Sequence, residues 1–283
     1  MLWESEVMTL ALSNDQVEHY RTQGWLSPLD VLTEAEAAES RAKLEAFESE
    51  HGPFGTRAER SRAYLPFTWV DRIMRNPLLV DMVEDLIGPD ILCWNAIFWI
   101  KEPGTGSFVG WHQDASYWGL DNLELVTVWV ALSEAGEDAG CMSVLPGSQR
   151  QTLDHDETYD ADNLLTRGQH IHDIDPADTV AMPLKPGQAS FHNVATAHGS
   201  GPNRSAQRRI GLSLHYMPTH TRQTLADWDS AAFIRGEDRH HHFDHAPRPS
   251  RDLDPEVMAY HARSADALRR IVYDGADTSH TTR

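Results

Sequence analysis

The chain has 283 residues, which is long for one domain but within the range of β barrels that fold as a single unit. Its 24 Lys and Arg residues stand against 43 Asp and Glu, and the net charge of -19 argues against a nucleic-acid or anionic-membrane partner, because the field of the whole protein repels a polyanion. Two cysteines, Cys93 and Cys141, cannot form a disulfide framework. Since no apolar stretch reaches the ~18 residues that span a bilayer, the sequence predicts a soluble, cytoplasmic protein.

Capping signals predict three helices in the first ninety residues. Ser13 and Thr33 are each followed three residues later by Gln or Glu, the capping-box pattern that begins a helix. Asn76 ahead of Pro77 is a second kind of helix start. The predicted helices span residues 14–22, 34–50 and 77–87, so residues 1–90 are expected to be largely helical.

From residue 91 onward the pattern changes to short β-rich runs with turn signals between them. The predicted strands span residues 91–101, 107–114, 125–132, 141–145, 179–183, 189–192 and 209–217. This spacing favours a closed β architecture or jelly roll over a parallel α/β sheet. We expect one domain over 1–283, with a helical part at 1–90, a β core at 91–217 and an irregular segment with a short helix at 218–283. The polar stretch 149–178 interrupts the strands and is interpreted as an insertion or lid.

Three residues have the pattern of a mononuclear non-haem iron site, which uses two histidines and one carboxylate. His112 and Asp114 stand two apart, so on a strand both side chains leave the same face. The alternative is a surface pair at a strand end. His198 or His192 could supply the third ligand, and the Gly-rich turn expected after His198 favours His198 because it allows close approach of the backbone. Gly110 beside the pair would leave room for a cofactor.

An arginine on the last predicted strand indicates an acidic ligand. Arg209 shares a strand face with Gly211, Ser213 and His215, and this face would point into the barrel. A buried guanidinium is costly unless an anion meets it. An internal salt bridge is the alternative partner.

Several segments together resemble the phytanoyl-CoA dioxygenase family of iron(II)- and 2-oxoglutarate-dependent oxygenases. The resemblance covers roughly residues 12 to 217. The segments that carry it are NAIFWIKEPG at 95–104, WHQD at 111–114, VW at 128–129, GCMSVLPGS at 140–148, and HGSGPN at 198–203 followed by Arg209.

The resemblance implies a mainly β protein with a helical N-terminal layer around a double-stranded β-helix, a cupin-like jelly roll. In the family pattern His112, Asp114 and His198 bind Fe(II), and Arg209 binds the distal carboxylate of 2-oxoglutarate. Three further residues fall on family positions near the co-substrate or its lead-in strand: Trp129, Ser200 and Lys101. Related halogenases replace the aspartate with a small residue, whereas this chain keeps it. The implied reaction is therefore hydroxylation of a small organic metabolite by O2, with release of succinate and CO2.

Candidate substrate-binding residues follow from their positions near these motifs. Tyr117 and Trp118 come just after the metal pair, and Trp99 lies on the preceding strand. His192 and His215 are the remaining candidates. We expect a small-molecule substrate and a monomer or homodimer. The histidine-rich run 240–245 is interpreted as a solvated loop that folds over the cavity mouth rather than as a second metal site.

Two other classes of protein fit part of the same pattern. A cupin-like barrel can use these ligands for zinc- or manganese-dependent hydrolysis or isomerisation without O2. A metal-free ligand-binding barrel is the third reading. Arg209 disfavours the hydrolase, because hydrolysis needs no buried anchor for a carboxylate.

Overall fold

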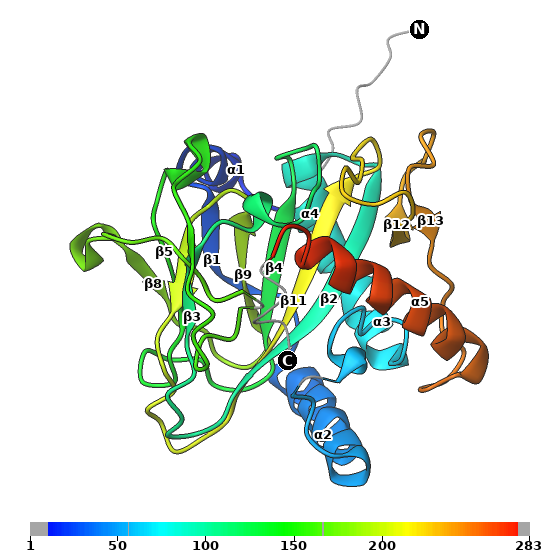
Figure 1. Cartoon of the computed structure of the whole chain (residues 1–283), viewed down its shortest axis with the longest axis horizontal. Helices are drawn as coiled ribbons and strands as arrows, with labels where there is room; N and C mark the ends of the chain where they lie inside the picture. Colours follow the sequence, from blue (N-terminus) through cyan, green and yellow to red (C-terminus); the bar gives the residue numbers. More distant parts are fainter. Residues whose placement is uncertain (1–10, 56, 166, 277–283) are drawn as a thin grey trace, which may run out of the picture.

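The computed structural model describes residues 11–55, 57–165 and 167–276 as two packed β-sheets with helices around them (Figure 1). Residues 1–10 of the predicted N-terminal part lie outside the described residues. The helices are α1 (Asn14–Gln23), α2 (Glu34–His51), α3 (Thr68–Met74), α4 (Pro77–Ile87) and α5 (Pro255–Val272). The strands are β1 (Trp25–Asp30), β2 (Ile91–Lys101), β3 (Val109–His112), β4 (Val126–Ala131), β5 (Met142–Val144), β6 (Asp156–Glu157), β7 (Gln169–His170), β8 (Val180–Met182), β9 (Gln188–Asn193), β10 (His198–Ser200), β11 (Arg209–Pro218), β12 (Ser230–Arg235) and β13 (Asp244–His245).

Side-chain caps explain where the N-terminal helices begin. Ser13 and Thr33 each accept a hydrogen bond from the backbone N–H three residues on, and the side chain of that third residue bonds back to the cap. Asn76 accepts from N–H groups in the first turn of α4. Gly24 ends α1 with a φ of 84°, which favours glycine. All three predicted helices are confirmed to within one residue at each end.

The strands form a seven-stranded sheet in the order β1-β9-β4-β11-β2-β12-β13 and a four-stranded sheet in the order β3-β10-β5-β8, and β6 and β7 form a separate two-stranded sheet. Trp129 and Ala131 of the larger sheet pack with Met142, Val144 and Met182 of the smaller one, so the inner faces of the two sheets meet. The predicted mainly β fold, a double-stranded β-helix or jelly roll, is therefore confirmed. Figure 1 shows the smaller sheet to one side of β4, β11 and β2.

The larger sheet is buried on both faces. On its outer face Met74 and Val80 of α3 and α4 join one hydrophobic cluster with Val128 and Leu212. On its inner face a cavity of about 800 Å³ lies between the sheets. The last helix helps to enclose this cavity, since Leu268 of α5 lines it and packs in the same cluster as Trp94 and Trp118.

The structure corrects four sequence predictions about elements. The strand predicted over 107–114 ends at residue 112, and Asp114 begins a short 3-10 helix. The predicted turn at 199–201 is largely strand, because β10 pairs with both β3 and β5. The segment after residue 217 is less irregular than predicted, since β12 pairs with β2, while the helix predicted within 218–283 is present as α5. No strand was predicted at β1, which lies at the sheet edge and contains Pro28.

Cys93 and Cys141 are buried free thiols. Within the described ranges no helix is both long enough and apolar enough to cross a bilayer.

A fully buried ion pair holds the segment before α3 to the sheet. The Arg62 side chain has no exposed surface and lies 2.6 Å from the Asp229 carboxylate, which is equally buried. Arg62 also donates to the carbonyls of Trp94 and Ser230, and the Trp94 indole N–H donates to Asp229 at 2.6 Å. This carboxylate thus fixes both a buried cation and a tryptophan that lines the cavity.

We expect Asp229→Ala to lower the free energy of unfolding by about 3–5 kcal/mol, because it leaves the Arg62 guanidinium buried without an anion. Urea denaturation measures the loss. The matched control is Asp266→Ala, which removes ion pairs to Arg269 and Arg270 at the surface and is expected to cost less than about 1 kcal/mol. Equal losses in the two variants would contradict the role given to the buried pair.

Candidate functional site

Antiparallel pairing of two short strands brings two histidines of the predicted site face to face. His198 on β10 is the register partner of His112 on β3, and their ring centroids lie 4.2 Å apart. Both side chains are buried. His112 Nδ1 lies 2.8 Å from the Gly110 carbonyl, and His198 Nδ1 lies 3.0 Å from the Thr196 carbonyl. Because a carbonyl only accepts, each neutral ring is protonated at Nδ1 and keeps the lone pair of Nε2 for a metal.

Asp114 completes a group that can hold a metal ion. One potential ligand atom each from His112, Asp114 and His198 lie within 4.8 Å of one another, and His112 Nε2 is 3.4 Å from Asp114 Oδ1. Burial by itself raises the pKa of Asp114, but the neighbouring rings of His112, His192 and His198 hold it well below its usual range. Burial, followed by the neighbouring His112 and His192, lowers the pKa of His198 well below its usual value. A carboxylate and neutral imidazoles are the protonation states that bind a divalent metal.

His192, the competing candidate, lies beside this group but outside it. Its Nε2 is 3.8 Å from Asp114 Oδ2, and its ring centroid is 4.3 Å from that of His198. Both of its ring nitrogens are buried and have no hydrogen-bond partner among the described residues. Thr127, which the sequence analysis did not select, lies 3.4 Å from Asp114 Oδ2.

Arg209 lies on the inner face of β11 over the ring of Trp129, with its guanidinium carbon 4.5 Å from the ring centroid. Gly211 makes this stacking possible, because a Cβ there would lie 1.8 Å from the Trp129 ring. Arg209 Nη1 donates to the Gly140 carbonyl at 2.8 Å and to Ser200 Oγ at 3.3 Å. Its Nε is buried without a partner among the described residues, and burial lowers its pKa to about 10. The predicted alternative, an internal salt bridge, is not formed within the described part of the chain.

A second buried cation lies next to Arg209. Lys101 Nζ is 2.6 Å from Ser200 Oγ and 3.1 Å from the Ser200 carbonyl. Burial, followed by the charge of Arg209, lowers the pKa of Lys101 to about 6. Trp129, Ser200 and Arg209, which the family pattern placed near the co-substrate, all line the cavity, and Lys101 of the lead-in strand contacts Ser200 behind them. The Arg209 cation has no carboxylate beside it, and an anion bound at this end of the cavity would also favour the protonated form of Lys101.

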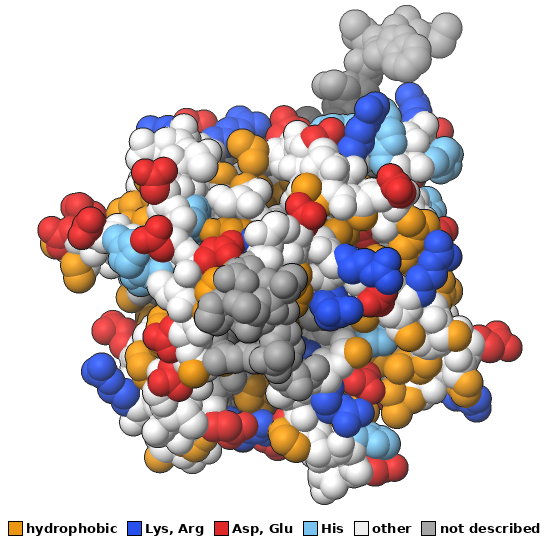
Figure 2. Space-filling model, viewed as in Figure 1, with side chains coloured by type: hydrophobic (Ala, Val, Ile, Leu, Met, Phe, Trp, Pro, Cys, Tyr) orange, Lys and Arg blue, Asp and Glu red, His pale blue; other side chains and the backbone are white. Residues whose placement is uncertain are grey.

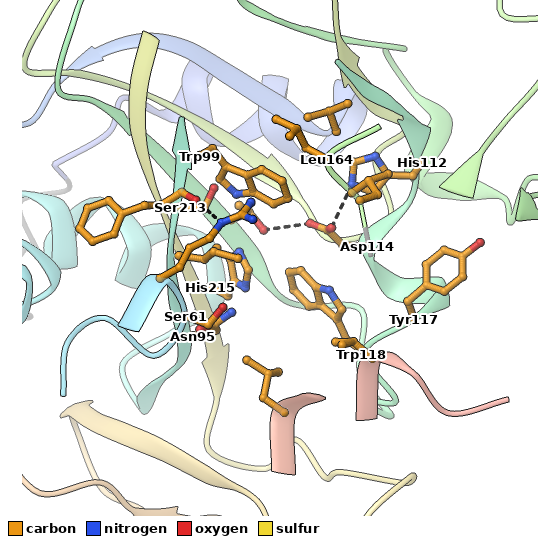
Figure 3. Close-up of a pocket in the computed structure, with 18 of the residues that line it drawn as sticks. Ser61, Asn95, Trp99, His112, Asp114, Tyr117, Trp118, Leu164, Ser213 and His215 are labelled. Atoms are coloured by element: carbon orange, nitrogen blue, oxygen red, sulfur yellow. Dashed lines mark hydrogen bonds and ion pairs between the residues drawn. The ribbon is translucent and has the colours of Figure 1, made fainter. Parts of the chain in front are cut away.

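The remaining predicted residues form an aromatic wall. Trp99, Tyr117, Trp118 and His215 all line the cavity, and the His215 ring stacks on Trp118 at 4.3 Å. Figure 3 shows Trp99, Trp118 and His215 around the Asp114 carboxylate, while the Tyr117 ring points away from it. Burial lowers the pKa of His215 to about 4, so its imidazole is neutral near pH 7.

Two predictions about glycine and histidine positions are wrong. A Cβ at Gly110 would lie 2.4 Å from the Gln169 carbonyl, so this glycine makes room for the insertion 149–178 rather than for a cofactor. The run 240–245 does not line the cavity. Its His241 and His245 instead surround a separate hollow and approach Asp238, with which they form a second group that could hold a metal.

The insertion is anchored beside the metal group through Gln113. The Gln113 amide donates to the carbonyls of Gln151 at 2.8 Å and Ala195 at 2.6 Å, and its oxygen accepts from Leu153 N–H at 2.9 Å. The insertion residue Leu164 then lines the cavity opposite α5 (Figure 3). Sequence reasoning missed this role of Gln113, because a buried glutamine between two ligand candidates has no pattern of its own.

Asn95 and Arg60 also line the cavity and were not predicted. Asn95 is buried, and its oxygen accepts from Arg62 N–H at 2.8 Å. Arg60 ends a short 3-10 helix, Ala58–Arg60, which is too short for a periodic pattern to indicate which side chains face inward.

Comparison with known proteins gives one family and a close fold relative. A family model described as phytanoyl-CoA dioxygenase matches residues 20–211. The chain is 32% identical to a probable alpha-ketoglutarate-dependent hypophosphite dioxygenase of Stutzerimonas stutzeri over 54% of each chain. It is 30% identical to the peroxisomal phytanoyl-CoA dioxygenase of Rattus norvegicus over 50% of this chain and 43% of that protein, so it spans about half the length of these relatives. The solved structure of the non-heme monooxygenase ThoJ is 33% identical, with a TM-score of 0.81, over 91% of this chain and 97% of that one.

We expect Gln113→Ala to loosen the insertion, because three hydrogen bonds that hold residues 151–153 and 195 are lost. Limited proteolysis should cleave the variant within 149–165 several times faster than the parent protein. Gln188→Ala serves as the control, since this side chain bonds Asp30 and Lys185 at the surface. Cleavage at the parent rate would show that Gln113 does not anchor the insertion.

Proposed function

Since this chain belongs to the phytanoyl-CoA dioxygenase family, we propose that it is an Fe(II)- and 2-oxoglutarate-dependent oxygenase that hydroxylates a small organic molecule. One observation carries the proposal. A buried group of two histidines and a carboxylate shares its cavity with Arg209, a buried cation that has no carboxylate of the described chain beside it. The relatives named above for an alpha-ketoglutarate-dependent and a non-heme activity support the same chemistry.

His112, Asp114 and His198 would hold the iron. The donor set fits, because both histidine Nε2 atoms are available and the three ligand atoms lie within 4.8 Å. When bound, iron with 2-oxoglutarate supplies the O2-dependent oxidation of a C–H bond. Thr127, 3.4 Å from Asp114 Oδ2, orients the carboxylate from the side of β4.

Arg209 would bind the distal carboxylate of 2-oxoglutarate. Its unpartnered Nε and its contact with Ser200 give it donors for a carboxylate, and the Trp129 ring holds the guanidinium flat against the sheet. Lys101 adds a second positive charge when it is protonated. A hydrolase would leave both cations without an anion, which is why the oxygenase is favoured over the hydrolase alternative.

The aromatic wall and the insertion would exclude water around the substrate. Trp99, Trp118 and Leu164 present apolar surface on the substrate side of Asp114 (Figure 3). The buried free thiols of Cys93 and Cys141 support a reducing compartment, and we propose a cytoplasmic protein.

We expect Asp114→Ala to weaken Fe(II) binding more than about 100-fold, because loss of a ligand exceeds the usual effect of an outer partner. Anaerobic iron binding and formation of succinate from 2-oxoglutarate are the two measurements, and both should fail together. Asp266→Ala, at the cavity rim, is the control and should retain both. A parent protein that binds no iron, or a variant with full succinate formation, would contradict the proposal. For a metabolite that stimulates turnover, a product heavier by one oxygen supports hydroxylation.

We expect 2-oxoglutarate binding to take up close to one proton near pH 7.5. Lys101 is mostly neutral there because its pKa is about 6, and a dicarboxylate bound beside it favours the ammonium form. Calorimetric titration in buffers of different ionisation enthalpy measures the uptake. Lys101→Met should abolish it. Binding without uptake in the parent protein would place Lys101 away from the co-substrate.

A further inference from the structure

The arginines of this chain follow a rule with two exceptions. In the described residues, every buried or half-buried arginine forms an ion pair with a carboxylate, apart from Arg60 and Arg209. Both exceptions line the same cavity, and both stack on a tryptophan. Arg209 already has a ligand in the proposed function. Arg60 has none.

The surroundings of Arg60 leave its charge uncompensated. Its Nε donates to the Phe98 carbonyl at 2.8 Å and its Nη1 to the Gly55 carbonyl at 3.5 Å, and its guanidinium carbon lies 4.9 Å from the Trp99 ring centroid. These contacts fix the plane of the guanidinium but supply no negative charge. Burial lowers the pKa of Arg60 to about 10, which still leaves it fully charged near pH 7. A charge held in this way is costly unless an anion meets it.

The charges of the cavity differ from those of the whole chain. The protein has a net charge of -19, and acidic side chains are scattered over the face in Figure 2, where Lys and Arg gather over α5. The charged residues that line the cavity, histidines aside, are Arg57, Arg60, Arg209, Arg269, Asp114 and Asp266. Arg57 pairs with Glu59 and Arg269 with Asp266, so Arg60 is the cation left for a substrate among the described residues.

The rest of the wall defines what such an anion is attached to. Trp94, Trp99, Trp118 and Phe54 give the cavity a largely aromatic lining, and its volume of about 800 Å³ exceeds what a dicarboxylate needs. The side-chain amide of the buried Asn95 also lines the cavity. Its oxygen accepts from Arg62 N–H, and its N–H2 group has no partner among the described residues and can donate to a ligand. Apolar surface with one cation and one polar donor suits an amphipathic molecule.

We propose that the substrate is an organic anion with a large apolar or aromatic body, and that Arg60, stacked on Trp99, binds its carboxylate, sulfonate, phosphonate or phosphate group. That this anion is the substrate rests on the proposed oxygenase function. The anion site itself depends only on the cavity. It therefore has a test that needs no turnover.

Two dyes with one skeleton separate the charge from the body. 8-Anilinonaphthalene-1-sulfonate carries a sulfonate that neutral N-phenyl-1-naphthylamine lacks, and the fluorescence of both rises in an apolar cavity. The iron-loaded protein with saturating 2-oxoglutarate is titrated without oxygen, so that Arg209 is occupied. We expect Arg60→Met to weaken sulfonate dye binding about 10- to 100-fold, the range of a lost hydrogen bond to a charged group. Binding of the neutral dye should change less than twofold.

Matched variants keep the result specific. Arg57→Met removes a neighbouring cavity arginine that already has its carboxylate, and should leave both dyes bound as in the parent protein. Arg60→Lys should restore part of the sulfonate affinity, and thermal unfolding should show that each variant is folded. Unchanged sulfonate binding in Arg60→Met overturns the proposal. So does a loss confined to 2-oxoglutarate affinity, which would assign Arg60 to the co-substrate. Failure of iron binding or succinate formation would instead count against the oxygenase function, and the same dye titration on the metal-free protein would still test the anion site at Arg60.

Discussion

The antiparallel pairing of β3 with β10 is the constraint on which the site depends. Its register sets His112 opposite His198, and the short 3-10 helix after β3 then brings Asp114 back to them. The same logic operates on the larger sheet, where β11 pairs with β2 and sets Arg209 opposite Lys101. Because side chains alternate between faces, a shift of one residue in either ladder would turn these groups out of the cavity. The backbone hydrogen bonds of these two strand pairs therefore set the positions of the site residues that the strands carry.

Buried charge in this protein is treated in two different ways. Arg62 is compensated inside the chain by Asp229, and the pair ties the segment before α3 to the sheet. The buried Arg209 and the half-buried Arg60 contact carbonyls and tryptophan rings but no carboxylate of the described chain. A guanidinium over an aromatic ring gains on the order of 1 kcal/mol, which is well below the cost of an isolated buried charge. These two guanidinium groups therefore leave positive charge in the cavity that an anionic ligand can offset. We propose that this contrast separates structural arginines from ligand-binding ones.

Local signals in the sequence predicted most of the fold. Capping residues gave the three N-terminal helices, and turn residues delimited most of the core strands closely, because both act over a few residues. The predictions that failed concern strands whose pairing partners lie far away in the sequence. Strand β10 is held between β3 and β5, although Gly199 and the Gly201 that follows the strand indicate a turn, and β12 joins the core of the sheet through β2. Of the candidate site, the residue types and spacing indicated His112, Asp114 and Arg209, and they left His198 and His192 both open as the third ligand. Gln113 and Arg60 could not be found in this way, because their roles come from carbonyls and rings that the fold supplies.

Net charge and local charge answer different questions about partners. At physiological ionic strength, exposed charges more than about 8 Å apart are largely screened, so the acidic surface acts mainly on large polyanions that approach many charges at once. Inside the cavity the dielectric is lower and screening is weak, so two or three cations outweigh the distant surface. An acidic protein can therefore refuse nucleic acid and still select small anions. We therefore expect the net charge of -19 to restrict the size of an anionic ligand rather than its sign, and we expect the residues of the cavity wall to determine its shape.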